Sequence, residues 1–315
     1  MTLINKGEKL VSVVIPTYNR AQMVCDCVDS VLAGDYSNLE IIIVDDASTD
    51  NTSEICMTKY KTEKRIVCIR NDTNVLTAKS RNNGLLSAHG DYVLFLDNDN
   101  IASADMISKL VRVLESDKSI GLAGALSVDA NSNSIWTLGA TYNFFTSRPV
   151  NLHEGENVTN VSPHGLYSTF YSPNASLVHT DFAKKIGGFD ASYGMMYEEA
   201  DFGYRLNKEG YRAVICADAR TSHLGYAGKD DMPQLRRLGI ESALRTYCFA
   251  RNRTKFMRRF APLWCLIGYH LFFAYAFILY YCFVALRNNR PDIAKAYFAG
   301  AIAGLFGRYG KRGEL

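Results

Sequence analysis

Short apolar runs alternate with helical patterns over roughly the first 120 residues of the chain. The runs are VSVVIP, EIIIVDD, RIVCIRN and YVLFLDND, and they are apolar on both faces, as strands buried in a parallel sheet are. Between them apolar residues recur at helical spacing, for example at Val24, Val28 and Leu32 and from about Thr77 to Ala88. The alternation predicts an α/β fold with a mostly parallel sheet covered by helices.

The pattern changes further along the chain. Between about Leu126 and Ser172 periodicity is weak and Asn, Ser, Gly and Pro are frequent, which predicts irregular loops and short strands. From Phe260 to Leu286 no residue is charged, and this run is long enough to cross a bilayer. We therefore expect an α/β domain over 1–225, a basic amphipathic helical segment over 226–259, and a hydrophobic membrane segment with an amphipathic tail over 260–315.

The balance of acidic and basic residues also changes at the boundary between residues 1–225 and 226–315. Residues 1–225 hold 20 Lys and Arg against 27 Asp and Glu, whereas residues 226–315 hold 15 against 5. Basic residues interleaved with apolar ones suit a helix on an anionic membrane surface better than a nucleic-acid site, because an uncharged run follows. Since Lys and Arg flank Phe260–Leu286 at both ends, the run could span the bilayer, re-enter it, lie in its plane or be buried in an oligomer.

Pairs of acidic residues follow two of the expected strands, at an edge where α/β sheets bind ligands. Asp45 and Asp46 end one strand, and Asp97 and Asp99 form D-x-D after another. Such carboxylates can bind a divalent cation together with substrate phosphates, although Asp also serves turns and helix caps. The first strand runs into PTYNR rather than G-x-G-x-x-G, and no P-loop motif is present, which excludes the usual dehydrogenase and ATPase sites.

A third acidic cluster, in YEEAD, comprises Glu198, Glu199 and Asp201. Carboxylates so close together raise one another's pKa towards a value useful for a general base. The plainer interpretation is that acids in a first helical turn interact favourably with the helix dipole.

Together these stretches, with NVLTAKSRNNGL and IGGFDASYGMMYEEADFGYRLNKEGYR, resemble the family 2 glycosyltransferases of the GT-A fold over roughly Val11 to Leu224. Rhamnosyltransferase-like enzymes are among the nearest look-alikes. The resemblance implies that residues 1–225 are a catalytic domain. It implies inverting transfer from a nucleotide-diphosphate sugar, with Mn²⁺ or Mg²⁺, to a lipid-linked or cell-surface glycan. We also expect the protein to work at the cytoplasmic face of the cell membrane. Its eight scattered cysteines without paired spacing indicate a reducing compartment, and its basic, apolar C-terminal region indicates a membrane surface.

The resemblance also implies residue roles. Asp99 would be the main metal ligand, with Asp97 and His223 as further candidates. Glu199 would be the general base, although relatives carry Asp there, and Glu198 and Asp201 would support the acceptor. YCFARNRTKFMRRFAP resembles a segment after the catalytic domain in membrane-associated relatives, with Arg251-Asn252 near the mouth of the site. The expected nucleotide-binding residues are Pro16, Thr17, Asn19, Arg20, Asp46, Ser48, Asn74, Arg81, Asp97 and Asn98, the last standing where many relatives have Asp. Arg81 would reach the nucleotide through its diphosphate.

The sequence pattern also bears on two other functions. A sugar nucleotidyltransferase on a similar sheet would need a Gly-rich, basic loop after the first strand, which the chain lacks. A non-catalytic membrane adaptor with a nucleotide-binding fold would have lost the key acids, which are all present. The sequence is compatible with an oligomer, and it does not define the donor base, the sugar, the linkage or the choice between Mn²⁺ and Mg²⁺.

Overall fold

The computed structural model describes residues 8–129, 132, 134–224 and 233–309. One large sheet has the strand order β10-β12-β6-β11-β4-β1-β2-β3, with β5 beside β12 and β7 beside β6. Strands β3, β2, β1 and β4 run parallel, as do β6 and β12, while β11 is antiparallel between β4 and β6. The strands are β1 (Val11–Thr17), β2 (Leu39–Asp45), β3 (Ile66–Arg70), β4 (Tyr92–Leu96), β5 (Asn100–Ala102), β6 (Ile120–Asp129), β7 (Ile135–Thr137), β10 (Leu166–Thr169), β11 (Ala175–His179) and β12 (Arg212–His223).

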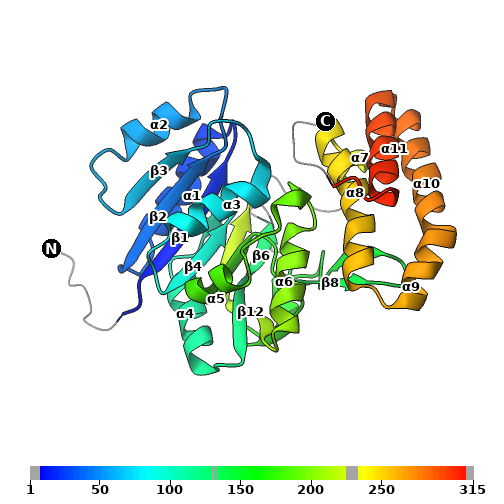
Figure 1. Cartoon of the computed structure of the whole chain (residues 1–315). Helices are drawn as coiled ribbons and strands as arrows, with labels where there is room; N and C mark the ends of the chain where they lie inside the picture. Colours follow the sequence, from blue (N-terminus) through cyan, green and yellow to red (C-terminus); the bar gives the residue numbers. More distant parts are fainter. Residues whose placement is uncertain (1–7, 130–131, 133, 225–232, 310–315) are drawn as a thin grey trace.

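Helices cover both faces of this sheet (Figure 1). Val13 and Ile15 of β1 belong to an apolar cluster with α1 and α4, whereas Val14 belongs to a cluster with α3 and α6 on the other face. Both faces of the central strands are thus buried, which confirms the expected α/β fold and its mostly parallel sheet. The helices of this part are α1 (Ala21–Leu32), α2 (Thr52–Lys59), α3 (Leu76–Ser87), α4 (Met106–Ser116), α5 (Thr180–Lys185) and α6 (Glu198–Lys208).

The weakly patterned region holds short strands, as expected. Besides β7 and β10 it contains a separate antiparallel pair, β8 (Ala140–Asn143) and β9 (Arg148–Asn151). This pair lies near the helices of the C-terminal part (Figure 1), and Tyr142 and Phe144 pack against Phe256.

The C-terminal part is a bundle of helices beside α6 (Figure 1). Its central helix, α8, is more buried than the expected amphipathic helix on a membrane surface. Asn252, Arg253 and Thr254 are almost fully buried, and Arg253 lies 4.1 Å from the Phe277 ring centroid and 3.0 Å from Tyr297 Oη. An aromatic cage thus takes the place of water around this charge. The helices are α7 (Gln234–Arg237), α8 (Ala243–Phe260), α9 (Leu263–Gly268), α10 (Ala274–Arg287) and α11 (Pro291–Leu305).

One helix in the described part of the chain is long and apolar enough to cross a membrane. It runs from Leu263 to Arg287, through α9, a π-helical turn at Tyr269–Phe273 and α10, with a mean hydropathy of 1.7. Its buried side, with Tyr269, Tyr281 and Ala285, packs in the same apolar cluster as α8 and α11. The helix is therefore part of the bundle on one side and open on the other.

Candidate active site

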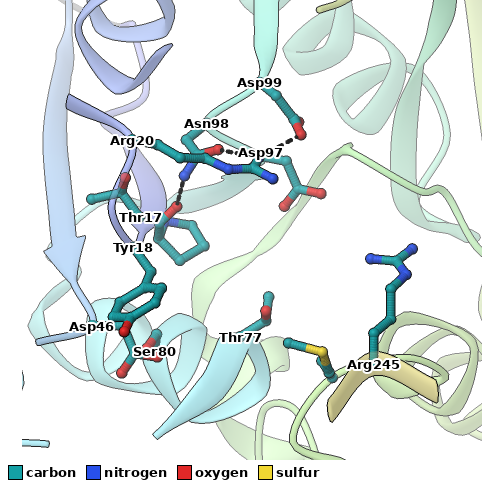
Figure 2. Close-up of a pocket in the computed structure, with 12 residues that line it drawn as sticks. Thr17, Tyr18, Arg20, Asp46, Thr77, Ser80, Asp97, Asn98, Asp99 and Arg245 are labelled. Carbon is teal, nitrogen blue, oxygen red and sulfur yellow. Dashed lines mark hydrogen bonds and ion pairs between the residues drawn. The ribbon is translucent and has the colours of Figure 1, made fainter. Parts of the chain in front are cut away.

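Two adjoining pockets lie beyond the carboxyl ends of β1, β2 and β4. Each has a volume of about 320–340 Å³. The first pocket, lined by Pro16, Thr17, Arg20 and Asp46 among others, is drawn in Figure 2. The second is lined by Glu198, Glu199, His223, Trp136 and Tyr171 among others. Thr77, Asp97, Asp99, Met195 and Arg245 line both, so the two pockets form one continuous site.

Not every expected nucleotide-binding residue faces the first pocket. Asn19, at a φ of 52°, receives a hydrogen bond from the amide of Thr49 (2.7 Å), and its own amide donates to Ser48 Oγ (2.9 Å). These bonds join the loop after β1 to the loop after β2. Asn19 and Ser48 therefore shape the pocket from behind, and direct contact with a nucleotide stays a prediction for both.

Asp46 lines the first pocket and also fixes the start of α3. Its carboxylate accepts hydrogen bonds from the amides of Val75 (2.7 Å) and Leu76 (2.9 Å) and from Asn71 Nδ2 (3.0 Å). Asn74 accepts from the amide of Leu76 at 3.3 Å and is not among the residues lining either pocket. The protein's own donors thus already hold the Asp46 carboxylate in place at the pocket wall.

The D-x-D motif is tied to the loop after β1. Asn98 Nδ2 donates to the carbonyl of Pro16 at 3.0 Å, and Arg20 reaches both Asn98 Oδ1 (3.2 Å) and Asp99 Oδ2 (2.9 Å). Figure 2 shows Arg20 extending across Asn98 towards Asp99. The Asn in the middle of the motif therefore joins β4 to β1, a role that an amide performs and that needs no charge.

Asp99 and His223 form the best pair for a divalent cation. Asp99 Oδ1 and His223 Nε2 are 3.7 Å apart, too far for a hydrogen bond but suitable for two ligands of one cation at about 2.1–2.3 Å each. The His223 ring stacks on Trp136, and its Nδ1 is buried without a hydrogen-bond partner among the described residues. No three His, Cys, Asp or Glu side chains gather as a metal site in those residues, so the pair fits a cation whose other ligands are phosphates and water.

Arg81 organises the acidic side chains. It is buried, and its guanidinium pairs with Asp97 (2.5 Å), Glu199 (2.8 Å) and Glu198 (3.3 Å). Because three carboxylates already surround this cation, its predicted reach to a diphosphate would require breaking ion pairs. In this structure Arg81 instead holds acids from two distant parts of the chain in one place.

Glu199 has the environment of a general base. Burial, together with the nearby Asp97 and Glu198, raises the pKa of Glu199 to about 8, although Arg81 opposes this shift. Burial also raises the pKa of Glu198, again against Arg81. The Glu199 side chain is 25% exposed and Glu198 only 8%, so Glu199 is the more accessible from the second pocket.

Asp201 lies apart from the other two acids. Its side chain is fully buried, lines neither pocket, and pairs with Arg205 and Arg259 at 2.7 Å each. The bond to Arg259 joins α6 to the end of α8. The structure thus gives Asp201 an interhelical contact, and its support of an acceptor stays a prediction.

Residues of α8 hold the loop before α6. Asn252 Nδ2 donates to the carbonyl oxygens of Tyr193, Met195 and Met196, each at 2.8 Å, and Arg251 donates to that of Tyr193 at 2.8 Å. This loop contains two consecutive residues at positive φ, Met196 (67°) and Tyr197 (73°), a conformation that costs free energy without glycine. The sequence placed Arg251-Asn252 at the mouth of the site, but they lie behind its wall.

Sequence reasoning missed Arg245. This residue comes from the first turn of α8, almost fifty positions beyond Glu199, and Figure 2 shows it projecting from α8 towards the D-x-D side of the pocket. Trp136 and Tyr171, from the weakly patterned region, were missed as well. No short motif signals these residues, because their positions depend on how the second half of the chain folds back.

The sequence model described as "Glycosyl transferase family 2" matches residues 12–171, and that of "Glycosyl transferase family group 2" matches residues 92–303. The glycosyltransferase GlyG of Streptococcus pneumoniae is 33% identical over 129 residues, 41% of this chain and 43% of that protein. The Escherichia coli UDP-Glc:α-D-GlcNAc-diphosphoundecaprenol β-1,3-glucosyltransferase WfaP is 40% identical over 110 residues, 35% of this chain and 43% of that protein. These alignments cover less than half the length of either relative.

Among solved structures, the mannosyltransferase PcManGT of Pyrobaculum calidifontis, in complex with GDP-Man and Mn²⁺, superposes with a TM-score of 0.58 at 16% identity. The superposition covers 96% of this chain and 88% of that one. At this identity the likeness concerns the fold, which is GT-A. The family 2 model matches half of the sequence, over β1, β2 and β4 and over Asp46, Asp97 and Asp99, so the chain belongs to glycosyl transferase family 2.

Proposed function

We propose that the protein is an inverting glycosyltransferase that moves a sugar from a nucleoside-diphosphate donor to a hydroxyl of a lipid-linked or cell-surface glycan. The supporting observation is Glu199, a carboxyl with a pKa raised to about 8, in a pocket continuous with the D-x-D motif. The nucleoside would lie in the first pocket, and the acceptor would enter the second. A hexosyl or rhamnosyl group as the transferred sugar rests on family resemblance alone.

The proposed reaction is a single displacement at the anomeric carbon. The acceptor oxygen bonds to that carbon from one face while the bond to the diphosphate oxygen breaks on the other, which inverts the configuration. Glu199 takes the hydroxyl proton as the new bond forms. A carboxylate whose conjugate acid has a pKa near 8 is a stronger base than an ordinary Glu, and Arg81 holds it in position.

Asp99 and His223 would hold Mn²⁺ or Mg²⁺, with Asp97 as a further candidate ligand. Such a cation supplies positive charge to the leaving diphosphate. Arg20 pairs with Asp99 in this structure and lines the first pocket, so it is placed to keep this carboxylate turned towards the diphosphate.

An acceptor at the membrane is supported by two observations. WfaP is named for transfer to a sugar on diphosphoundecaprenol, a lipid diphosphate. In this chain, the outer side of α9 and α10 exposes a stripe of large apolar side chains, which we call the apolar stripe. It consists of Leu263, Trp264, Ile267, Leu271, Phe272, Tyr275, Leu279, Tyr280, Phe283 and Leu286. We propose that this stripe rests on the cytoplasmic face of the cell membrane.

The decisive experiment is Glu199→Gln, which keeps shape and hydrogen bonding but removes proton acceptance. Screening nucleotide-diphosphate sugars with a lipid-diphosphate sugar acceptor and Mn²⁺ or Mg²⁺ first identifies the donor, and NMR of the product gives its anomeric configuration. We expect inversion, and a fall in transfer rate of about 10²–10⁴-fold in the variant. Glu209→Gln, an exposed acid just beyond the other end of α6, is the matched control and should keep the native rate. A product with retained configuration would contradict the proposal, as would native transfer by Glu199→Gln.

A further inference from the structure

Arg245 lies where the two pockets meet, and its side chain forms no close ion pair with an acid of either pocket. Its side chain lines both, and its Nε atom is buried without a hydrogen-bond partner among the described residues. Its ion-pair partner is Glu241, four positions earlier in the chain. Glu241 Oε1 lies 3.9 Å from Arg245 Nε, which is close to the outer limit of an ion pair. The guanidinium therefore keeps most of its donors available to a ligand.

The other two arginines lining the pockets are already paired. Arg20 is bonded to Asp99 and Asn98, and Arg81 to three carboxylates. Among the arginines that line the described pockets, Arg245 is thus the one that no pocket carboxylate holds. Its charge is nevertheless close enough to lower the pKa of Glu198, although burial has the larger and opposite effect.

A diphosphate in this site would meet several acidic side chains. Asp46, Asp97 and Asp99 line the pockets, and their carboxylates repel an anionic ligand. A cation on the metal side offsets part of this repulsion. The Arg245 guanidinium, which lines both pockets, adds charge and paired donors that match phosphate oxygens.

We propose that Arg245 binds the diphosphate group of a substrate, so that a residue of α8 takes part in substrate binding. This inference deepens the proposed function and rests on it. The diphosphate belongs either to the nucleotide donor, where it is the leaving group, or to a lipid-linked acceptor. Arg245 would then perform the role that the sequence assigned to Arg81, while Arg81 organises the acids.

The test measures binding by the full-length protein and does not require transfer. Arg245→Gln and Arg245→Lys are compared with Arg237→Gln, which removes the same charge from an exposed position on α7 outside both pockets. UDP and GDP are titrated beside UMP and GMP in the presence of Mn²⁺, and a polyprenyl diphosphate in micelles is titrated beside the monophosphate. Thermal unfolding checks that each variant is folded.

We expect Arg245→Gln to weaken diphosphate binding by about 10–100-fold, the value of a hydrogen-bonded charge pair, and monophosphate binding by much less. Arg245→Lys should retain part of the affinity, and Arg237→Gln should bind like the native protein. Loss confined to UDP or GDP assigns Arg245 to the donor, and loss confined to the lipid probe assigns it to the acceptor. Native binding of every diphosphate by Arg245→Gln overturns the inference alone. A native protein that binds no diphosphate overturns it together with the proposed function.

Discussion

At the scale of single residues, the structure separates acids that resemble one another in sequence. Glu198 and Glu199 line the second pocket and share Arg81, whereas Asp201 points to Arg205 and Arg259. The same four positions of sequence thus supply one accessible carboxyl, which is the proposed base, one more buried neighbour and one interhelical ion pair. Helical geometry explains the division, because consecutive residues on a helix point in different directions.

The raised pKa of Glu199 predicts the pH dependence of transfer. Only the ionised carboxylate accepts a proton, so kcat/KM should rise with pH and level off above about 8, the pKa of Glu199. Rates measured from pH 6 to 9.5 at low donor concentration check this. The rising limb should disappear in Glu199→Gln, and a native profile that is flat over this range would argue against Glu199 as the base.

The raised pKa of Glu199 also affects the free energy of unfolding, which should fall with pH where the transfer rate rises. The folded protein keeps a proton on Glu199 that the unfolded chain releases above the ordinary value of 4.5, so the free energy of unfolding should decrease between about pH 4.5 and 8. Denaturant titrations across this window should show a smaller decrease for Glu199→Gln. This readout is independent of substrates, so it tests the environment of the carboxyl even before the donor is known.

At the scale of elements, α8 acts as a support for the loop that leads into α6. One amide, Asn252 Nδ2, contacts three carbonyl oxygens of that loop, and the loop ends in two residues at positive φ. Backbone strain of this kind persists only where neighbouring contacts hold it. The position of Glu199 therefore depends on Asn252, a residue that lines neither pocket.

We expect Asn252→Ala to lower kcat by about 10–100-fold while UDP or GDP affinity changes little, because a small displacement of the base affects the chemical step most. The control is Thr254→Val, which removes a buried hydrogen bond of α8 to Tyr269 on the bundle side. Kinetics and thermal unfolding are measured for both. If the two variants lose equal stability and equal activity, Asn252 only stabilises the bundle and does not position Glu199.

At the scale of the whole molecule, the helix formed by α9 and α10 has one side buried in the C-terminal bundle and one exposed apolar side. Tyr269, Tyr281 and Ala285 face α8 and α11, while the apolar stripe is open to the outside. Arg287 follows the stripe directly, and Lys295 is exposed on α11. The inner side of this helix packs onto Arg253 and Thr254, which are buried, so the helix would have to leave this core in order to span a bilayer. The packing therefore favours a helix lying in the membrane plane, with cations near anionic headgroups and Trp264, Tyr275 and Tyr280 at the interface.

Two charges on the stripe should release the protein from membranes. The double variant Phe272→Glu and Leu279→Glu is expected to lose most of its sedimentation with vesicles containing anionic phospholipid, because both side chains are more than two-thirds exposed in the stripe. The control is Leu86→Glu on α3, an equally exposed apolar residue outside the bundle, which should sediment like the native protein.

The proposed in-plane arrangement would also place both ends of the helix on one side of the membrane. Tags before Leu263 and after Arg287 should therefore be accessible to protease from the same side. Tags on opposite sides would show a spanning helix. If the double variant changes an oligomer into a monomer but still binds vesicles, the stripe is instead an interface between copies of the chain.

The α/β sheet, the acids at its carboxyl edge and the acidic start of α6 could be predicted because each depends on local pattern. Buried parallel strands need apolar residues on both faces, and the chain direction brings their carboxyl ends to one edge, so Asp46, Asp97 and Asp99 had to lie near one another. Family resemblance then joined these pieces to Glu199. Local pattern and this resemblance together are sufficient to predict the candidate base and the D-x-D motif from the sequence.

Tertiary structure decided which charges are free. The sequence could not indicate that Arg81 is surrounded by three acids, that Arg253 is enclosed by aromatic rings, or that Arg245 stands between the pockets. Whether an arginine is paired, buried or open depends on contacts with residues far away in the chain. The same holds for the apolar run from Phe260, whose composition fits a span but whose inner side is committed to α8 and α11. Local pattern determines secondary structure, whereas the partners of a long side chain follow from how distant elements pack.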